Sequence, residues 1–217
     1  MSPIVGTPTA PSFLGGSIVL PPNRCRHEPT RQARPWIGER GTAGTVAVVG
    51  AGKMGLPLAI QFASHGWSVI AVDIDPTVVE AINEGRTHLE HEPGLADLLG
   101  DARAAGLLRA TVDGGAAARE ADVVVLIVPI MLDPAAHPDR RSMDAAVASI
   151  APGLHAGSTV VFETTLPVGD TRGRYAPMLA ELSGLTPDLD MFVAFSPERL
   201  YSGAVISNLA TYPKLVG

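Results

Sequence analysis

A strand, a glycine turn, a helix, a second strand and an acidic residue follow one another early in the chain. The apolar run Val46–Val49 leads into G-x-G-x-x-G at 50–55, and an amphipathic stretch then reaches Ser64. A second apolar run, Val69–Val72, ends at Asp73. In this order the glycine pattern predicts a βαβ unit that binds a dinucleotide.

Each glycine of the pattern has a different physical task. Gly50 permits the tight turn, Gly52 allows a pyrophosphate to approach the backbone, and Gly55 lets the helix pack closely on the strand. The helix that follows presents unpaired N–H groups and a partial positive charge to an anion. The predicted phosphate-binding turn comprises Gly50, Ala51, Gly52, Lys53, Met54 and Gly55.

Asp73 identifies the expected dinucleotide. It follows Gly55 by 18 residues, close to the spacing of an acid that binds the ribose 2′-hydroxyl. A carboxylate there repels a 2′-phosphate, so the sequence favours NAD over NADP. The alternative is a glycine-rich turn in an α/β fold that binds nothing.

Composition excludes several classes of protein. The only cysteine, Cys25, rules out an intramolecular disulfide and fits a reducing compartment, so we expect a cytoplasmic protein. The longest apolar run, Val123–Val128, is too short to cross a bilayer, and we expect no membrane partner. Residues 1–44 carry five arginines and two glutamates, so the net charge of −6 leaves −9 on residues 45–217. Such an acidic body argues against a nucleic-acid partner.

Residues 1–44 differ from the rest of the chain. They contain seven prolines and six glycines without sustained apolar periodicity. A segment of this kind buries too little apolar surface to offset its ordering entropy, so we predict a disordered leader over 1–44 and one folded domain over 45–217.

From Thr45 onward, short apolar runs alternate with amphipathic stretches. This pattern predicts an α/β, doubly wound and mostly parallel sheet of the Rossmann type. The expected strands are Val46–Val49, Ser68–Asp73, Leu108–Val112, Val123–Val128, Ser158–Phe162 and Met191–Phe195, with a short terminal strand in Tyr212–Gly217. The expected helices are Met54–Ser64, Pro76–Glu84, Leu95–Ala105, Gly115–Arg119, Met143–Ile150 and Thr171–Ser183.

Ligands of such sheets bind beyond the carboxyl ends of the strands. There the chain places Val128, then Thr164 and Thr165 in ETTLPVG, then Glu198 and Arg199 in SPERL. The two hydroxyls suit a polar ligand, and a capped turn is the alternative. Glu198 is a candidate general base and Arg199 a candidate anion ligand, with a surface ion pair as the alternative.

Two histidines lie in a polar loop but do not predict a metal site. His88 and His91 are close to Glu90 and Glu92, yet the histidines lack the i, i+4 spacing of helical ligands. We expect solvent-exposed loop histidines and no metal.

Four motifs together resemble the UDP-glucose/GDP-mannose dehydrogenase family, including its UDP-N-acetylmannosamine dehydrogenases. They are GAGKMGLPLA, NEG…EPGL, ETTLPVGDTR and SPERLYSGAV…YPKLVG, in family order from Thr45 to Gly217. The resemblance implies oxidation of the C6 alcohol of a UDP- or GDP-sugar to a carboxylate with NAD⁺, through a thioester on a cysteine.

The resemblance also implies roles for individual residues. Gly50, Gly52 and Gly55 match the glycines under the pyrophosphate, and Asp73 matches the ribose acid. Thr164 and Thr165 match hydroxyls at the nicotinamide end, where Thr165 helps to hold the hydrolytic water and Glu198 is the acid/base. Glu198, Arg199 and Leu200 match positions that line the sugar-nucleotide site.

The chain departs from the family pattern in places. Ile130-Met131 stands where the family usually has Thr-Pro, which removes one cofactor hydrogen bond. The family's catalytic cysteine lies beyond the point that matches Gly217, and Cys25 precedes the first strand. We therefore expect the 217-residue chain to be inactive alone and monomeric, with a homodimer for the full-length family protein. The alternative is a stand-alone, non-catalytic NAD-binding module.

Overall fold

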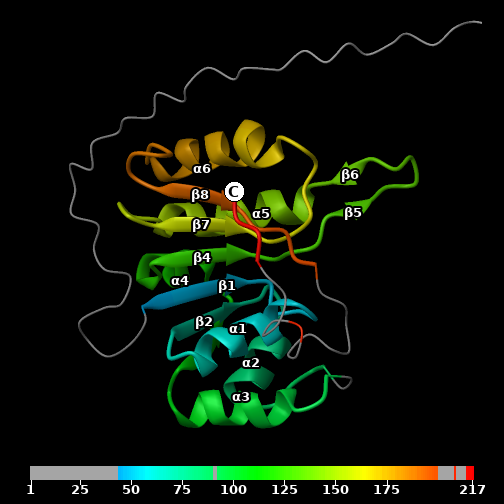
Figure 1. The fold of residues 1–217 in the computed structure, drawn as a ribbon, viewed down its shortest axis with the longest axis vertical. Coiled ribbons are helices and arrows are strands. Elements are labelled where there is room, and N and C mark those ends of the chain that lie inside the picture. The colour runs from blue at the N-terminus through cyan, green and yellow to red at the C-terminus, as the bar shows by residue number, and fades with distance from the viewer. Residues whose placement is uncertain (1–43, 90–91, 200–207, 209–213) are drawn as a thin grey trace, which may run out of the picture. The chain divides into compact units, whose positions relative to one another are not determined.

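A computed structural model describes residues 44–89, 92–199, 208 and 214–217. Nearly all of the predicted leader, with Cys25, lies outside these residues, as do His91 and Leu200. The described residues form a six-stranded parallel sheet in the order β3-β2-β1-β4-β7-β8 (Figure 1), and the predicted doubly wound α/β fold is confirmed. The strands are β1 (Thr45–Val49), β2 (Ser68–Val72), β3 (Leu108–Thr111), β4 (Val123–Leu126), β7 (Thr159–Phe162) and β8 (Phe192–Phe195).

Helices cover both faces of the sheet. The α-helices are α1 (Gly55–Ser64), α2 (Pro76–Asn83), α3 (Leu95–Ala104), α4 (Gly114–Glu120), α5 (Arg141–Ile150) and α6 (Ala176–Ser183). Two separate buried clusters show which helices share a face. One joins the sheet to α1, α2 and α3, and the other joins it to α4, α5 and α6.

The central strand β1 explains how one sheet supports two cores. Val46 and Val48 belong to the cluster with α1, whereas Ala47 and Val49 belong to the cluster with α4 and α5. All four are at most 5% exposed. Because successive side chains of a strand point to opposite faces, a continuous apolar run is what a doubly covered strand requires.

The strand register aligns the carboxyl ends of the central strands. Val49 pairs with both Val72 and Leu126, Leu126 pairs with Phe162, and Phe162 pairs with Phe195. The residues that follow these strands therefore lie along one edge of the sheet. Strands β2 and β3 lie on one side of β1, and β4, β7 and β8 lie on the other. The boundary between β1 and β4 is therefore the switch point of the sheet, where ligands of this architecture bind.

The glycine turn after β1 brings α1 unusually close to the strand. Gly50 adopts φ +100° and donates its N–H to the Val72 carbonyl at 2.8 Å. A Cβ atom on Gly55 would lie 1.7 Å from the Gly50 carbonyl oxygen, which no side chain can tolerate. The close packing of helix on strand therefore depends on glycine at position 55.

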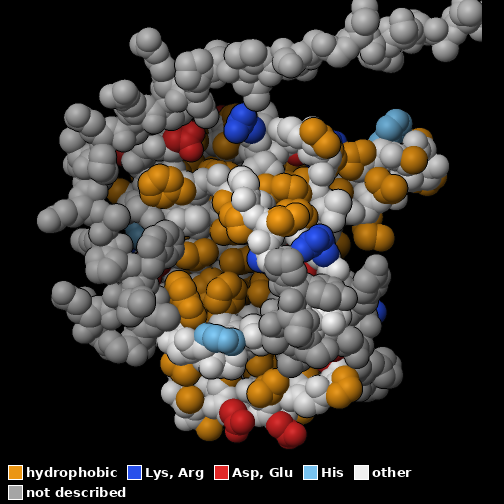
Figure 2. Space-filling view, in the orientation of Figure 1, with side chains coloured by type: hydrophobic (Ala, Val, Ile, Leu, Met, Phe, Trp, Pro, Cys, Tyr) orange, Lys and Arg blue, Asp and Glu red, His pale blue; other side chains and the backbone are white. Residues whose placement is uncertain are grey.

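Two features were not predicted from the sequence. A hairpin of β5 (Met131–Leu132) and β6 (Pro138–Asp139) projects from the sheet edge, and hydrophobic side chains gather on it (Figure 2). The predicted helix over 171–183 instead begins as a π-helix, η2 (Thr171–Tyr175), before α6. Pro177 near the start of α6 has no N–H to give to a preceding carbonyl, which accounts for the wider first turns.

Other boundaries shift by one or two residues. A short 3₁₀ turn, η1 (Ala151–Gly153), extends α5. The predicted terminal strand is wrong for Lys214–Gly217, which the structure leaves outside any strand, and Tyr212 and Pro213 are not among the described residues. Gly217 and Phe195 nevertheless exchange two backbone hydrogen bonds, at 2.7 and 2.9 Å. In the part of the chain that is described, no helix is long and apolar enough to cross a bilayer.

We expect Gly55→Ala to lower the free energy of unfolding by at least about 2–3 kcal/mol, the upper range for overpacking, because the new methyl group would collide with backbone. Gly52→Ala is the matched control, since nothing lies within 4 Å of its added Cβ, and we expect a change below about 0.5 kcal/mol. Urea unfolding measures both. Equal stability of Gly55→Ala and wild type would contradict the close-packing argument.

Candidate functional site

The turn at 50–55 and the first turn of α1 form a surface suited to an anion. Gly52 is exposed, and the space where its side chain would stand is open. Met54 is the N-cap of α1 and makes no side-chain capping bond. The first N–H groups of a helix have no intrahelical acceptor, so this end can accept a phosphate. Lys53 is exposed on the same turn.

Asp73 is tied to the glycine turn as well as to the end of β2. Its Oδ2 atom accepts the Ala51 N–H at 2.9 Å, and its Oδ1 atom accepts the Asp75 N–H at 3.0 Å. The side chain is half-buried. The predicted ribose acid and the predicted phosphate turn are therefore neighbours, and Asp73 also helps to hold that turn in shape.

Thr164 and Val128 meet across the ends of β7 and β4. The Thr164 hydroxyl donates to the Val128 carbonyl oxygen at 2.6 Å, so its proton is committed while its oxygen can still accept a bond. Thr165 is exposed. Of the two predicted hydroxyls, Thr164 fastens the sheet edge and Thr165 faces solvent.

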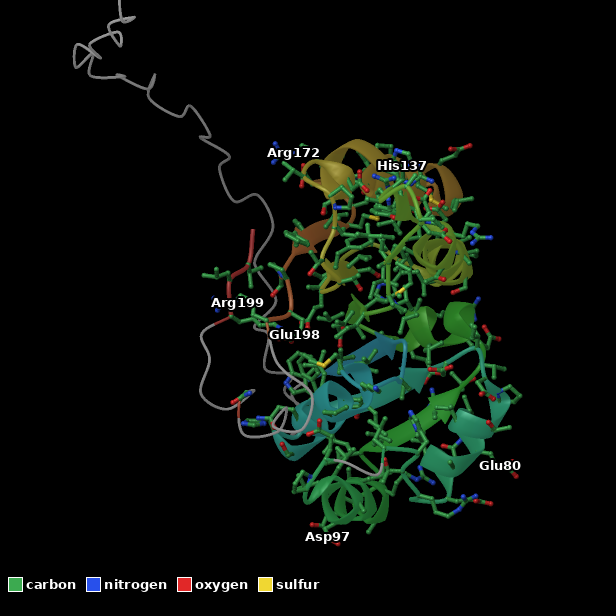
Figure 3. The ribbon with its side chains drawn as sticks, turned by 90° about the vertical axis from the view of Figure 1, so that its right-hand side faces the viewer. Glu80, Asp97, His137, Arg172, Glu198 and Arg199 are labelled. Atoms are coloured by element: carbon green, nitrogen blue, oxygen red, sulfur yellow. The ribbon has the colours of Figure 1, made fainter. Side chains whose placement is uncertain are left out.

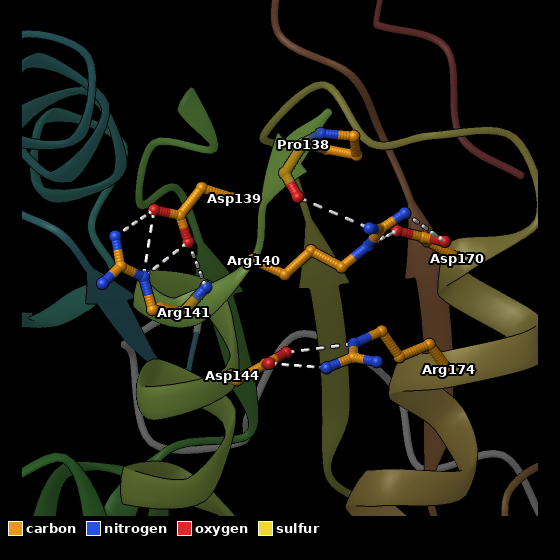
Figure 4. A network of polar contacts seen from close by, with 7 residues as sticks. All are labelled: Pro138, Asp139, Arg140, Arg141, Asp144, Asp170 and Arg174. Carbon is orange, nitrogen blue, oxygen red and sulfur yellow. Dashed lines mark hydrogen bonds and ion pairs between the residues drawn. The ribbon is translucent and has the colours of Figure 1, made fainter. Parts of the chain in front are cut away.

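The loop that carries these hydroxyls is anchored at its far end by ion pairs (Figure 4). Arg140, which precedes α5, donates from Nε and Nη2 to the two oxygens of Asp170, at 2.6 and 3.2 Å. This hydrogen-bonded pairing raises the pKa of the Arg140 guanidinium. Arg174 of η2 pairs in the same two-pronged way with Asp144 of α5. The π-helix and the loop before it are thus fixed against α5.

Glu198 lies at the same sheet edge, just beyond β8. Its N–H donates to the Glu163 carbonyl at 2.8 Å, and its Oε1 atom accepts the N–H of Arg199 at 2.7 Å. Its Oε2 atom accepts from Nζ of Lys214 at 2.6 Å. Figure 3 places Glu198 and Arg199 side by side, and Arg199 is exposed.

Comparison with known proteins decides the family. The model of the UDP-glucose/GDP-mannose dehydrogenase family, NAD binding domain, matches residues 44–217. The chain belongs to this family. It is 37% identical over 183 residues to the UDP-N-acetyl-D-mannosamine dehydrogenase of Salmonella typhi, a match that covers 80% of this chain.

Solved structures of dehydrogenases share the fold of this family member. The GDP-mannose dehydrogenase of Pseudomonas aeruginosa superposes with a TM-score of 0.76 at 27% identity, over 79% of this chain. The UDP-D-ManNAc dehydrogenase of Pyrococcus horikoshii does so with a TM-score of 0.75 at 32% identity, over 80% of this chain. The chain spans about 40% of the length of these relatives, within their NAD-binding portion.

The departure from the family's Thr-Pro pair lies where the unpredicted hairpin begins. Ile130 is half-buried and packs against the core, whereas Met131 is 67% exposed at the start of β5. Neither side chain offers a hydroxyl to a ligand at this edge.

Sequence reasoning overlooked Glu163 and Lys214. The Glu163 side chain is only 5% exposed, and burial raises its pKa from 4.5 to about 7. Lys214 lowers the pKa of Glu163 by hydrogen bonding at 2.8 Å, and the nearby charge of Glu198 raises it. The sequence pattern that could have identified Glu163 is a carboxyl directly after a buried strand, because such positions lie at the edge of the sheet where ligands bind. Lys214 gave no signal, since its partners are distant in sequence.

The expectation of no metal site remains a prediction. Among residues for which the structure gives positions, no group of three or more His, Cys, Asp or Glu side chains is arranged to hold a metal ion. His88 is exposed, as expected, and His91 is outside the described residues.

We expect stability to fall as pH rises from about 4.5 to about 7, because the folded protein holds the Glu163 proton more tightly than the unfolded chain does. The free energy of unfolding that Glu163 contributes is fully present below its pKa in the unfolded chain. It is lost as pH rises past its pKa in the folded protein. At about 1.4 kcal/mol per pKa unit, a rise from 4.5 to about 7 gives a contribution on the order of 3–4 kcal/mol. Lys214 and Glu198 are the charged groups that face Glu163.

Glu163→Gln cannot titrate, so urea unfolding across this pH range should show a flatter dependence for the variant than for wild type. Glu181→Gln, which changes an exposed glutamate of α6, is the control and should keep the wild-type slope. Equal slopes for wild type and Glu163→Gln would contradict the assignment.

Proposed function

We propose that this chain is the NAD-binding portion of a nucleotide-sugar 6-dehydrogenase, which oxidises the C6 alcohol of a UDP- or GDP-sugar to a carboxylate. One observation supports this most strongly: a dinucleotide-type glycine turn and an acid/base candidate, Glu198, lie at the same edge of one parallel sheet. The family match and the similarity to UDP-N-acetyl-D-mannosamine dehydrogenases support the choice of substrate class.

The cofactor-binding roles follow the geometry of the turn. Open space at Gly52 and the uncapped start of α1 suit the pyrophosphate, and the Asp73 carboxylate suits a free 2′-hydroxyl. Bound NAD⁺ supplies a hydride acceptor. Thr165 and the oxygen of Thr164 are proposed to lie at its nicotinamide end, with Val128.

The chemical role of this chain centres on Glu198. Both of its carboxylate oxygens accept hydrogen bonds, which gives a general acid/base a defined orientation. Glu198 is proposed to exchange a proton with the water that Thr165 helps to hold. Arg199 and Leu200 are proposed to line the sugar-nucleotide site, where a guanidinium suits the diphosphate. A cytoplasmic setting and a homodimeric full-length protein are parts of the same proposal.

We expect the chain to bind NAD⁺ more tightly than NADP⁺, and Asp73→Ala to weaken NAD⁺ binding by about 1–3 kcal/mol, roughly 5- to 150-fold in Kd. The physical reason is loss of a charge-assisted hydrogen bond to the ribose. Asp73→Asn should also reduce the difference in affinity between NAD⁺ and NADP⁺, because it removes the repulsion between the carboxylate and the 2′-phosphate. Calorimetric titration measures each affinity.

Asp97→Asn controls for the loss of one negative charge. Asp97 is exposed on α3, and Figure 3 shows it on a different part of the molecule from Glu198. Because Asp73 also binds the glycine turn, melting curves must show that each variant is folded. Equal affinity of the wild type for NAD⁺ and NADP⁺ would overturn the assignment of Asp73.

We also expect UDP-N-acetyl-D-mannosamine or GDP-mannose to bind the NAD⁺-loaded chain, and Arg199→Ala to weaken that binding roughly tenfold, the effect of losing one charge-assisted bond. Saturation-transfer NMR on the sugar protons measures it. Arg172→Ala is the control, because Arg172 is exposed and Figure 3 shows it well away from Arg199. NAD⁺ binding without any sugar binding would favour the non-catalytic module.

A further inference from the structure

A single ammonium group joins two carboxylates at the sheet edge. Lys214 donates from Nζ to Oε2 of Glu163 at 2.8 Å and to Oε2 of Glu198 at 2.6 Å. The three side chains come from the end of β7, the end of β8 and the last residues of the chain. Those of Glu163, Glu198 and Lys214 are 5%, 12% and 36% exposed. These two ion pairs are therefore far more protected than ordinary surface pairs, which contribute little.

Backbone pairing fixes the position from which each side chain extends. Glu163 donates its N–H to the Leu126 carbonyl at 2.9 Å, and Glu198 donates to the Glu163 carbonyl. Gly217, three residues after Lys214, is bonded twice to Phe195 of β8. The cluster is therefore built into the sheet edge and does not depend on the chance meeting of long side chains.

The two carboxylate oxygens of Glu198 accept hydrogen bonds from different parts of the chain. Oε1 accepts the Arg199 N–H from the local chain, whereas Oε2 accepts from the ammonium group of Lys214, 16 residues away in sequence. Without Lys214, the carboxylate would keep one local bond and would lie beside Glu163 with no cation between them. At a pH high enough to ionise both carboxyl groups, repulsion between them would then move Glu198 away from its present orientation.

We propose that Lys214 is a positioning residue: anchored by buried Glu163, it holds the Glu198 carboxylate in the orientation that the proposed acid/base role requires. We call the contact of Lys214 with Glu163 and Glu198 the clamp. The role of Glu198 in catalysis rests on the proposed function, whereas the clamp rests on the geometry of the three side chains. Burial raises the pKa of Glu163, the nearby charge of Glu198 raises it further, and Lys214 lowers it.

Lys214→Met tests the clamp in the whole 217-residue chain without cofactor or substrate. We expect the Arg199 amide proton, whose acceptor is Glu198 Oε1, to exchange with solvent roughly tenfold faster in the variant, the effect of losing about one charge-assisted hydrogen bond. We also expect the pKa of Glu163 to rise above its wild-type value, because Lys214 lowers it. Amide exchange and carboxyl ¹³C NMR titration measure the two effects.

Two variants make the test specific. Lys214→Arg keeps a cation and should restore slow exchange to within about twofold of wild type. Lys53→Met removes the chain's other lysine, which is exposed on the glycine turn, and should change neither readout. A folded Lys214→Met variant with wild-type exchange at Arg199 would overturn the proposal.

A measurement on the wild type covers the case in which Lys214→Met fails to fold. A clamped ammonium exchanges its protons slowly, so the Lys214 NH₃⁺ group should give a ¹⁵N–¹H signal under conditions where that of Lys53 is lost. Absence of the Lys214 signal would contradict the clamp. Failure of NAD⁺ binding would instead refute the proposed function and leave these results unchanged.

Discussion

The parallel register of the sheet is the constraint on which the site depends. Because Val49, Val72, Leu126, Phe162 and Phe195 pair in sequence across the strands, the residues that follow them emerge at one edge. The glycine turn, Asp73, the hydroxyls after β7 and Glu198 are separated by up to about 150 positions in the chain, yet they share that edge. A one-residue slip in any strand would turn its side chains to the opposite face.

Buried charge is the second constraint. Glu163 is almost completely removed from water, which costs free energy for the ionised form, and its raised pKa expresses that cost. Lys214 offsets part of it, but one ammonium group faces two carboxylates. The cluster therefore adds little to the free energy of unfolding, because a buried ion pair rarely stabilises a protein more than an apolar contact does. Its main effect is to fix the orientation of the three side chains.

Much of the fold was accessible from the sequence, since its pattern is local. The six main strands and the helices were predicted within one or two residues at most boundaries, because buried strands form continuous apolar runs and the glycine turn marks the start of α1. The hairpin β5–β6 was not predicted, because its strands are two residues long and neither of them is buried. The π-helix was missed because helical periodicity cannot distinguish it from an α-helix.

For this chain, the sequence by itself determined the α/β class, the phosphate-type turn and the acid at the end of β2, because each of these is a short-range pattern of residues. Only the tertiary structure decided what those side chains contact. In the folded protein the Thr164 hydroxyl donates to the Val128 carbonyl, and the Asp73 carboxylate accepts the Ala51 N–H. Lys214 lies between Glu163 and Glu198 and donates to both. The physical reason is that these contacts join residues 16 to 51 positions apart in the chain, which meet only when the strands align.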